Sequence, residues 1–571
     1  MGPRRQEQRG RPLMARRKTT TQALVPTSMK DLKNTLWKAA DKLRGSLDSS
    51  QYKDVVLGLI FLKYVSDAFE ERRRRIAEEL SAEGFDEEAI EESQDDPDEY
   101  LGNGVFWVHP DARWEHLVAL AKVHDTQTIG QRITEAMDLL MADNSSLEGT
   151  LPRLFNRENV DQQRLGELLD LLNSLQFAGE GATKARDLLG EVYEYFLGQF
   201  ASSEGKRGGE FYTPASVVRT IVEVLQPGHG RVYDPCCGSG GMFVQAEKFL
   251  AAHHADASDL SVYGQELNEA TWRMAKMNLA IHGLTGNLGP RWGDTFTLDY
   301  HAGEQMDFIM ANPPFNISDW NRIEGDARWV HGVPPVGNAN YGWIQHILSK
   351  LAPGGSAGVV MANGSMTSNA GGEGEIRANI VENDLVTAMV ALPEKLFRST
   401  GIPVCLWFFA KDKTAGPGGR IDRTGQVLFI DARGLGHMVT RAERAFSDAD
   451  IQRIADTYHA WRGMDRLPLG TKDLSPTGDP EGDGAPVPTG PAGELGEYED
   501  VPGFCRSVPL AEIKQAGYAL TPGRYVGMPE PEDDGVPLDE KIARLTAELE
   551  KQFAESERLQ QVVREQLGRL R

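Results

Sequence analysis

Residues 307–315 have the sequence Asp307-Phe308-Ile309-Met310-Ala311-Asn312-Pro313-Pro314-Phe315. The apolar run at 308–311 meets two prolines, which predicts a buried parallel strand that ends in a turn. Proline has a fixed φ and no N–H, and Pro313 biases Asn312 away from helical backbone. Ligands of open α/β sheets bind beyond the carboxyl ends of strands. An amide and an aromatic ring there suit a flat heterocycle with an amino group. Taken alone, the stretch is explained equally well by a proline-terminated core strand.

Strands and helices alternate on both sides of this stretch. The pattern predicts strands at 231–234, 261–266, 291–294, 308–311, 356–362, 385–392, 404–410 and 428–430. It predicts helices at 214–225, 242–252, 268–282, 341–351, 373–382 and 448–462. Such alternation indicates an α/β fold, a doubly wound and mainly parallel sheet with helices on both faces.

Polar residues and glycines follow the first three predicted strands. The turn at 235–241 is rich in glycine and comes directly after Asp234, so a ligand could approach its backbone N–H groups. Glu266 ends the second strand and can accept from both hydroxyls of a ribose, while Asp294 ends the third and can accept from an adenine amino group. The turn lacks the G-x-G-x-x-G/A dinucleotide fingerprint. A sulfonium nucleoside such as S-adenosylmethionine has no pyrophosphate and needs only this partial arrangement.

A glycine-containing loop at 205–214 precedes the first strand. Thr213 can cap a helix whose first residue is Pro214. A helix N-terminus preceded by flexible backbone can receive a carboxylate or a phosphate. Taken alone, this loop is better explained as an ordinary capped helix.

Together these segments resemble the motif series of DNA adenine-N6 methyltransferases. More closely, the chain resembles the modification (M, HsdM-type) subunit of type I restriction-modification systems, over roughly residues 30–440. The segments that carry the resemblance are Glu210-Phe211-Tyr212-Thr213-Pro214, Asp234-Pro235-Cys236-Cys237-Gly238-Ser239-Gly240-Gly241-Met242-Phe243, Gly264-Gln265-Glu266-Leu267-Asn268, Asn312-Pro313-Pro314-Phe315 and Leu396-Phe397-Arg398-Ser399-Thr400-Gly401-Ile402-Pro403-Val404. Their order is that of the γ arrangement.

The resemblance implies an S-adenosylmethionine-dependent methyltransferase fold and methyl transfer, without a metal, to the N6 amino group of a flipped adenine in DNA. The cofactor-binding residues that it implies are Glu210, Phe211, Tyr212, Thr213, Pro214, Ala215, Asp234, Gly238, Ser239, Gly240, Gly241, Glu266 and Asp294. The catalytic residues that it implies are Asn312, Pro313, Pro314 and Phe315. Asn312 would accept from the target amino group through its side chain and Pro313 through its carbonyl, and Phe315 would stack on the base.

The composition along the chain predicts five segments. They are a disordered basic tail at 1–27, an α-helical domain at 28–180, the methyltransferase domain at 181–440, a helix with a Pro/Gly-rich linker at 441–538, and a partner-docking helix at 539–571. The tail could alternatively be a nucleic-acid-binding arm, and Met14 is an alternative start. The terminal helix carries an apolar stripe that needs a partner to cover it.

The net charge bears on how such a chain meets DNA. The formal charge is -23, which is unhelpful for a protein that grips DNA alone, because phosphate binding depends on Lys and Arg. The family resemblance implies DNA, a separate specificity (S) subunit that selects the sequence, and a second M subunit as partners. The chain has no G-x-x-x-x-G-K-[ST] phosphate loop and no convincing nuclease motif, so cleavage would need another chain, a restriction (R) subunit.

The cysteines and the apolar runs predict the compartment. Four cysteines in 571 residues favour a reducing environment. The longest apolar run that we identify, 404–410, is far shorter than a membrane helix, and no secretory h-region follows the basic start. We therefore expect a cytoplasmic protein without a membrane span. Cys236 and Cys237 are adjacent and lack a second pair at ligand spacing, so we expect no zinc site.

Two other functions stay open on the sequence. Asn-Pro-Pro followed by an aromatic also serves methyltransferases that act on RNA adenine or on a glutamine side chain, although the helical domain and the Phe-Tyr-Thr-Pro element favour DNA. A catalytically idle S-adenosylmethionine-binding scaffold of a defence complex is the alternative outside enzymes. The intact tetrapeptide at 312–315 argues against a scaffold.

Overall fold

The computed structural model describes most of the chain. The described residues are 29–41, 43, 47, 49–121, 126–174, 182–203, 213–253, 259–397, 402–416, 418–441, 443–465, 496–528, and 542–560 without 543–545, 548, 555 and 557. The predicted basic tail, the residues Glu210, Phe211 and Tyr212, and most of the Pro/Gly-rich segment lie outside these ranges.

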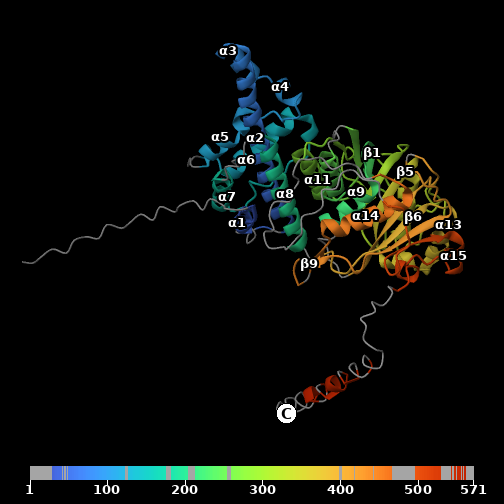
Figure 1. Ribbon diagram of the computed structural model, residues 1–571. Coiled ribbons are helices and arrows are strands. Elements are labelled where there is room, and N and C mark those ends of the chain that lie inside the picture. The colour runs from blue at the N-terminus through green and yellow to red at the C-terminus, as the bar shows by residue number, and fades with distance from the viewer. Residues whose placement is uncertain are drawn as a thin grey trace, which may run out of the picture.

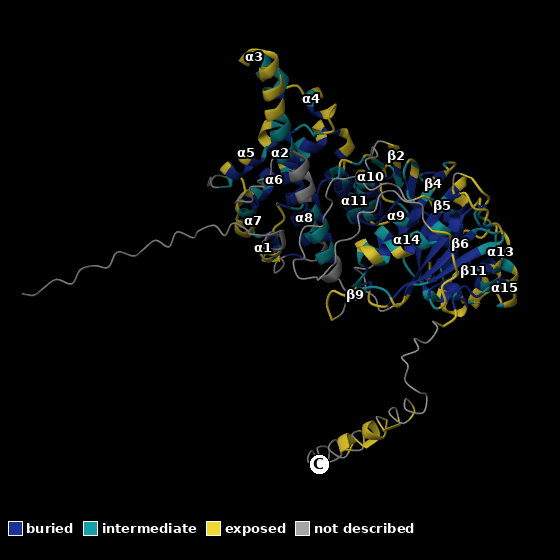
Figure 2. Cartoon of the chain, in the orientation of Figure 1, coloured by how far each residue is buried: buried dark blue, intermediate teal, exposed yellow. Residues whose placement is uncertain are grey.

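The first part of the chain is helical, as the sequence predicted. Its longer helices are α1 (Met29–Asp41), α2 (Ser49–Glu83), α3 (Glu87–Gln94), α5 (Trp114–Leu120), α6 (Ile129–Asp143), α7 (Gln162–Ser174) and α8 (Ala182–Ser203). The first half of α2 is buried because it is apolar on every side, from Val55 to Phe69. Beyond Glu70 the helix becomes charged and increasingly exposed, and it projects from the domain (Figures 1 and 2).

The second part of the chain is built on one nine-stranded sheet, in the order β11-β8-β6-β7-β5-β4-β1-β2-β3. The strands are β1 (Gly230–Asp234), β2 (Leu260–Gly264), β3 (Gly286–Asn287), β4 (Met306–Ala311), β5 (Leu351–Ala362), β6 (Val386–Ala391), β7 (Val404–Ala410), β8 (Gln426–Asp431) and β11 (Cys505–Pro509). Pairing is parallel except where β7 lies between β5 and β6 and where β11 pairs with β8. The predicted mainly parallel, doubly wound α/β sheet is confirmed.

Helices cover both faces of this sheet. The helices are α9 (Ala215–Leu225), α10 (Gly241–Ala252), α11 (Glu269–Ile281), α12 (Asn340–Lys350), α13 (Glu373–Glu382), α14 (Asp448–Arg462) and α15 (Leu510–Gln515). The helices α9, α10, α11 and α14 share one apolar core with the sheet, and α12, α13 and α15 share the other. The central strands are therefore buried on both faces, which explains why every residue of β6 and β7 is buried and why all but Thr387 are apolar.

Helix α11 joins the two parts of the molecule (Figure 1). Its Trp272, Ala275 and Leu279 belong to the core of the sheet, and its Met274, Met277 and Ile281 belong to the core of the helical domain. Across the junction the Arg273 Nε donates to the Gly149 carbonyl at 3.2 Å. Because α11 begins just after Glu266, the helical domain is tied to the edge where the predicted site lies.

Three details of the sequence prediction were wrong. The third strand is β3, and 291–294 is loop because the Gly293 N–H donates to the Glu266 carbonyl at 2.8 Å and not to a neighbouring strand. The second strand ends at Gly264. The sheet unit also extends past the predicted boundary at 440, since α14 packs on one face and β11 pairs with β8.

Further small elements complete the description. They are α4 (Asp98–Leu101) and a two-stranded hairpin of β9 (His437–Met438) and β10 (Arg444–Ala445). Among the described residues, no helix has the length and apolar character that crossing a membrane requires.

Gly358 tests the packing of α9 on the sheet. A Cβ at this position would lie 2.6 Å from the Ile221 Cγ2 and 3.0 Å from the Phe408 Cε1. We therefore expect Gly358→Ala to lower the free energy of unfolding by about 1–3 kcal/mol, as overpacking does. Gly354→Ala in the same strand meets nothing within 4 Å and should leave it nearly unchanged. Equal denaturant midpoints for the two variants would contradict this packing.

Candidate active site

The glycine-rich turn joins β1 to α10 at the carboxyl edge of the sheet. The Asp234 carboxylate lies beneath it, 2% exposed, and its Oδ1 accepts from the Cys236 N–H at 3.0 Å. Gly238 and Gly240 have φ values of +54° and +79°, which a side chain would disfavour. The Ser239 carbonyl accepts from the Asn278 amide of α11 at 2.8 Å. The turn is thus fixed from below and from the side.

Glu266 is locked to this turn. Its Oε2 accepts from the Gly238 N–H at 3.1 Å, and its Oε1 accepts from the Asn268 N–H at 2.8 Å. The carboxylate is buried, and burial raises its pKa. The Leu267 N–H also acts on this carboxylate, and a carboxylate has about four lone-pair sites, so some acceptor capacity is left. Glu266 and the glycine turn therefore form one rigid unit that can accept hydrogen bonds from a diol.

Asp294 lies on a loop beside this unit, and not at a strand end as predicted. Its Oδ1 accepts from the Phe296 N–H at 2.9 Å, and its Oδ2 accepts from the Asn321 amide at 2.5 Å. The following hydroxyl, that of Thr295, donates to the Pro235 carbonyl of the glycine turn at 2.6 Å. Asp294 is held next to the turn by these contacts and is half-buried.

Gln265 organises that loop, and the sequence analysis gave it no role. Its Nε2 donates to the carbonyls of Gly293 and Leu298 at 3.2 and 2.7 Å, and its Oε1 accepts from the Tyr300 N–H at 3.2 Å. The side chain is fully buried. A buried glutamine at a strand end is the signal that could have identified it, because such an amide must find partners for its donors and its acceptor.

Asn312 stands at the end of β4 with one half of its amide in use. Its Nδ2 donates to the Thr213 hydroxyl at 2.9 Å. Its Oδ1 is buried, and within the part of the chain that the structure describes no donor reaches it. A buried acceptor without a donor costs about 1–3 kcal/mol, so this oxygen calls for a donor, which the N–H group of a ligand could supply.

The Thr213 contact corrects the prediction for the upstream loop. Helix α9 begins at Ala215, Pro214 is its N-cap residue, and no side chain caps the helix. The Thr213 hydroxyl, which the sequence predicted as a cap, contacts Asn312. Of the predicted upstream residues, the structure thus brings Thr213 to the predicted catalytic residue Asn312.

The end of the tetrapeptide is held by aromatic packing and by a pair of amides. The rings of Phe315 and Phe397 meet edge to face with centroids 6.3 Å apart. Asn316 has a φ of +54°, its N–H donates to the Asn340 Oδ1 at 3.0 Å, and its Oδ1 accepts from the Asn340 Nδ2 at 2.9 Å. The sequence analysis missed Asn316 and Asn340. An asparagine directly after the motif and another at a helix start were the available signals.

The four cysteines are free. Burial raises the pKa of the thiols of Cys236 and Cys237, so neither is poised as a thiolate. Among the described residues, no group of His, Cys, Asp and Glu side chains could hold a metal ion.

Comparison with known proteins assigns the chain to a family. The model of the N-6 DNA Methylase family matches residues 184–534, and that of the HsdM N-terminal domain matches residues 32–172. The chain belongs to the family of type I restriction enzyme methylase subunits. The first match covers the whole sheet unit, including β11.

Individual relatives agree with this assignment. The chain is 44% identical over 450 residues to the type I restriction enzyme HindI methylase subunit of Haemophilus influenzae, covering 77% of this chain and 93% of the relative. It is 38% identical over 557 residues to the MjaIX methylase subunit of Methanocaldococcus jannaschii, covering 95% and 91%.

A solved structure shares the fold of this methylase-family chain. The crystal structure of the type I restriction-modification methyltransferase subunit from Streptococcus thermophilus has a TM-score of 0.67 and 23% identity, and covers 87% of this chain and 99% of that one. The helical domain and the sheet unit therefore recur together in a second protein.

The pKa of Asp234 gives a test of how the turn is built. Burial raises this pKa from 3.8 to about 7, so the folded protein keeps a proton that the unfolded chain releases. The free energy of unfolding should then fall between about pH 4 and pH 7, by up to about 1.4 kcal/mol per pH unit. We expect Asp234→Asn to gain thermal stability over the wild type across this range. A difference between them that is independent of pH would contradict the raised pKa.

Proposed function

We propose that this chain transfers a methyl group from S-adenosylmethionine to the N6 amino group of an adenine in DNA, as the methylase subunit of a type I restriction-modification system. The observation that carries the proposal is the Asn312 Oδ1. It is a buried acceptor that no described residue satisfies, it follows the sheet strand β4, and it belongs to a chain of the methylase family.

The residues at the carboxyl edge fit S-adenosylmethionine. When bound, this cofactor supplies an electrophilic methyl group on a sulfonium. The turn residues Gly238, Ser239, Gly240 and Gly241 would face the methionine end, together with Glu210 to Ala215. Glu266 would accept from the ribose hydroxyls, because its two oxygens are already oriented by backbone N–H groups. Asp294 would accept from the adenine amino group of the cofactor through Oδ2.

The target amino group needs two acceptors. Its lone pair is delocalised into the purine ring, so the nitrogen is a poor nucleophile. Acceptance of hydrogen bonds from both N–H groups, by the Asn312 Oδ1 and the Pro313 carbonyl, favours a tetrahedral nitrogen whose lone pair can attack the methyl group in line. The S–CH3 bond would break as the N–C bond forms, leaving a neutral thioether, and the methylated nitrogen would then lose one proton. The Thr213 hydroxyl holds the Asn312 Nδ2, so the amide presents its oxygen. Phe315 would stack on the extruded base, and Pro314 stiffens the loop between them.

Because the chain is acidic, we expect partner subunits to supply much of the contact with DNA. We propose that it acts with a specificity subunit, which selects the DNA sequence, with a second copy of itself, and with a restriction subunit where cleavage occurs. The terminal helix is the docking candidate. Its described apolar residues Ile542, Leu549, Phe553 and Leu559 are 54%, 49%, 61% and 49% exposed, and such a stripe needs a covering surface.

Asn312→Ala tests the catalytic assignment. We expect methyl transfer to DNA to fall by at least about 100-fold, the order of loss when a positioned hydrogen-bonding group is removed from a transition state. Cofactor affinity should be unchanged. The free energy of unfolding should fall by no more than about 1 kcal/mol, since the change also removes an unsatisfied acceptor. The control is Asn383→Ala, an exposed residue at the end of α13. Transfer at the native rate by Asn312→Ala would refute the assignment.

The same assay separates the substrates. Labelled cofactor is offered with DNA, RNA and protein in the presence of the specificity subunit. We expect the label in DNA. Label in RNA or in protein would favour the other Asn-Pro-Pro methyltransferases, and cofactor binding without transfer to any of the three would favour a scaffold.

Deletion of residues 539–571 tests the docking helix. We expect the shortened chain to bind S-adenosylmethionine as the full chain does and to lose co-elution with the specificity subunit, because the apolar stripe is gone. Substitution of Leu549 and Phe553 by Ser in the full chain should have the same effect. A complex that survives both changes would show that docking uses another surface.

A further inference from the structure

The chain between the catalytic tetrapeptide and α12 forms a loop that closes on itself. We call residues 317–339 the closing loop. At its base the Ala339 N–H donates to the Ile317 carbonyl at 3.0 Å, next to the amide pair of Asn316 and Asn340. Trp320 and Trp329 are buried inside it and pack edge to face with ring centroids 5.8 Å apart. The closing loop is therefore a compact unit that starts directly after the catalytic loop.

The closing loop contacts the segment between β3 and β4 that carries Asp294, residues 288–305, which we call the Asp294 loop. The Asn321 Nδ2 donates to the Asp294 Oδ2 at 2.5 Å. The Arg328 guanidinium donates to the carbonyls of the next two residues, from Nη1 to Thr295 at 3.0 Å and from Nη2 to Phe296 at 2.7 Å. The Phe296 ring packs on Trp320 with centroids 4.5 Å apart. Three consecutive residues of the Asp294 loop are thus held by one segment.

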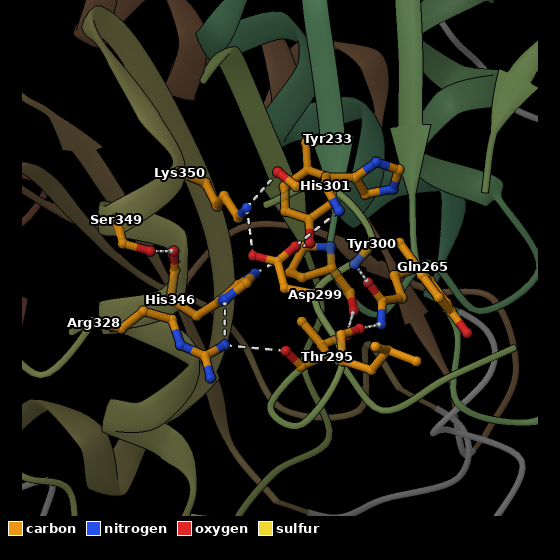
Figure 3. A network of polar contacts seen from close by, with 12 residues as sticks. Tyr233, Gln265, Thr295, Asp299, Tyr300, His301, Arg328, His346, Ser349 and Lys350 are labelled. Atoms are coloured by element: carbon orange, nitrogen blue, oxygen red, sulfur yellow. Dashed lines mark hydrogen bonds and ion pairs between the residues drawn. The ribbon is translucent and has the colours of Figure 1, made fainter. Parts of the chain in front are cut away.

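Arg328 is itself anchored to the sheet unit (Figure 3). It pairs with Asp326 and lies 3.0 Å from the His346 Nδ1. His346 is fully buried, and burial lowers its pKa to about 3, so the ring is neutral. Because a guanidinium can only donate, Nδ1 accepts and the ring proton is on Nε2, which lies 3.1 Å from the Tyr233 hydroxyl of β1.

The same network continues to the far end of the Asp294 loop. The Lys350 Nζ pairs with Asp299 at 2.5 Å and donates to the His301 carbonyl at 2.6 Å. His301 in turn lies 2.8 Å from the Gly264 carbonyl at the end of β2 through its Nε2. The Asp294 loop is therefore fastened at both ends, by Arg328 near its start and by Lys350 near its end (Figure 3).

We propose that Asn321 and Arg328 are positioning residues for S-adenosylmethionine, which set the Asp294 carboxylate for the amino group of the cofactor's adenine. The proposal rests on the proposed function. Asn321 fixes the plane of the carboxylate and leaves one lone pair of Oδ2 for the ligand. Arg328 fixes the backbone that carries it. The closing loop also follows the catalytic tetrapeptide closely in the chain. One segment would therefore position both Asp294, which we propose for the cofactor's adenine, and residues 312–315, which we propose for the target adenine.

The test compares S-adenosylmethionine with an analogue in which purine replaces adenine, so that the 6-amino group is absent. Dissociation constants are measured calorimetrically on the full chain in complex with the specificity subunit. The wild type should prefer S-adenosylmethionine on the order of tenfold or more, because a hydrogen bond to a charged group is lost with the analogue. Asn321→Leu and Arg328→Lys should bring this ratio close to one, since lysine cannot reach both carbonyls.

Two matched variants separate positioning from a loss of stability. Arg462 is 2% exposed and donates to the carbonyls of Lys413, Gly418 and Ile421. These residues lie in the connection from β7 to β8, which is at the opposite end of the strands from the site because β7 is antiparallel to β5. Arg462→Lys should cost as much thermal stability as Arg328→Lys and keep the wild-type ratio. Asn383→Leu is the control for Asn321→Leu. Because Asn321 is exposed, the Asn321→Leu variant should fold.

The outcomes distinguish this proposal from the proposed function. A wild-type ratio retained by both Asn321→Leu and Arg328→Lys, or a ratio near one in the wild type, overturns the positioning role. Both results come from binding and do not require turnover. Failure of the wild-type complex to methylate DNA would instead overturn the proposed function, while the binding ratio would still decide the role of Asn321 and Arg328.

Discussion

The hydrogen bond from the Asn312 amide to the Thr213 hydroxyl is the constraint on which the site depends. It uses the donor half of the amide and leaves the acceptor half buried and without a described donor. The prolines that follow keep the side chain at the end of β4, and Phe315 is held against Phe397. A fixed acceptor beside an aromatic ring can select a purine with an amino group and can hold that group's protons during transfer. The sheet, Thr213 and the downstream pair of Asn316 and Asn340 all serve to keep this acceptor in place.

The part of the site that we propose for the cofactor is built in the same way. Carboxylates are buried and oriented by backbone N–H groups, as with Glu266 on Gly238 and Asp234 beneath the turn. Burial of a charged group costs stability, and burial raises the pKa of both acids for the same reason. The cost is offset by rigidity, because a preorganised acceptor needs no rearrangement when a ligand arrives. Helix α11 extends this rigidity to the helical domain, whose core it shares.

Much of this arrangement could be predicted from the sequence, and the exceptions have physical reasons. Apolar runs bounded by glycine or proline located β1, β4, β6 and β7, because buried strands must be apolar on both faces. The strand β11 was missed because it is a short edge strand, Cys505–Pro509, that follows a long linker and pairs with a distant partner. Asp294 was predicted to end a strand because residues 291–294 resemble a short strand. The loop that the structure shows instead depends on hydrogen bonds from Gln265, which is distant in the sequence.

The residues of the candidate site also divide into those that a local sequence pattern predicted and those that depend on contacts between distant parts of the chain. Local patterns predicted Asn312, Glu266 and the glycine turn, since each lies within a few residues of the end of a strand. Thr213, Asn321, Arg328 and Asn340 act on residues far away in the chain, and only the fold brings them together. Their residue types were visible in the sequence, but their partners were not.

We propose that the acceptor at Asn312 directs a methyl group to the amino nitrogen of adenine in DNA. The most direct measurement is mass spectrometry of the nucleosides released from DNA after reaction with isotopically labelled S-adenosylmethionine and the methylase–specificity complex. We expect the label in N6-methyl-2′-deoxyadenosine. Label in a cytosine nucleoside, or at a ring position of adenine, would contradict it.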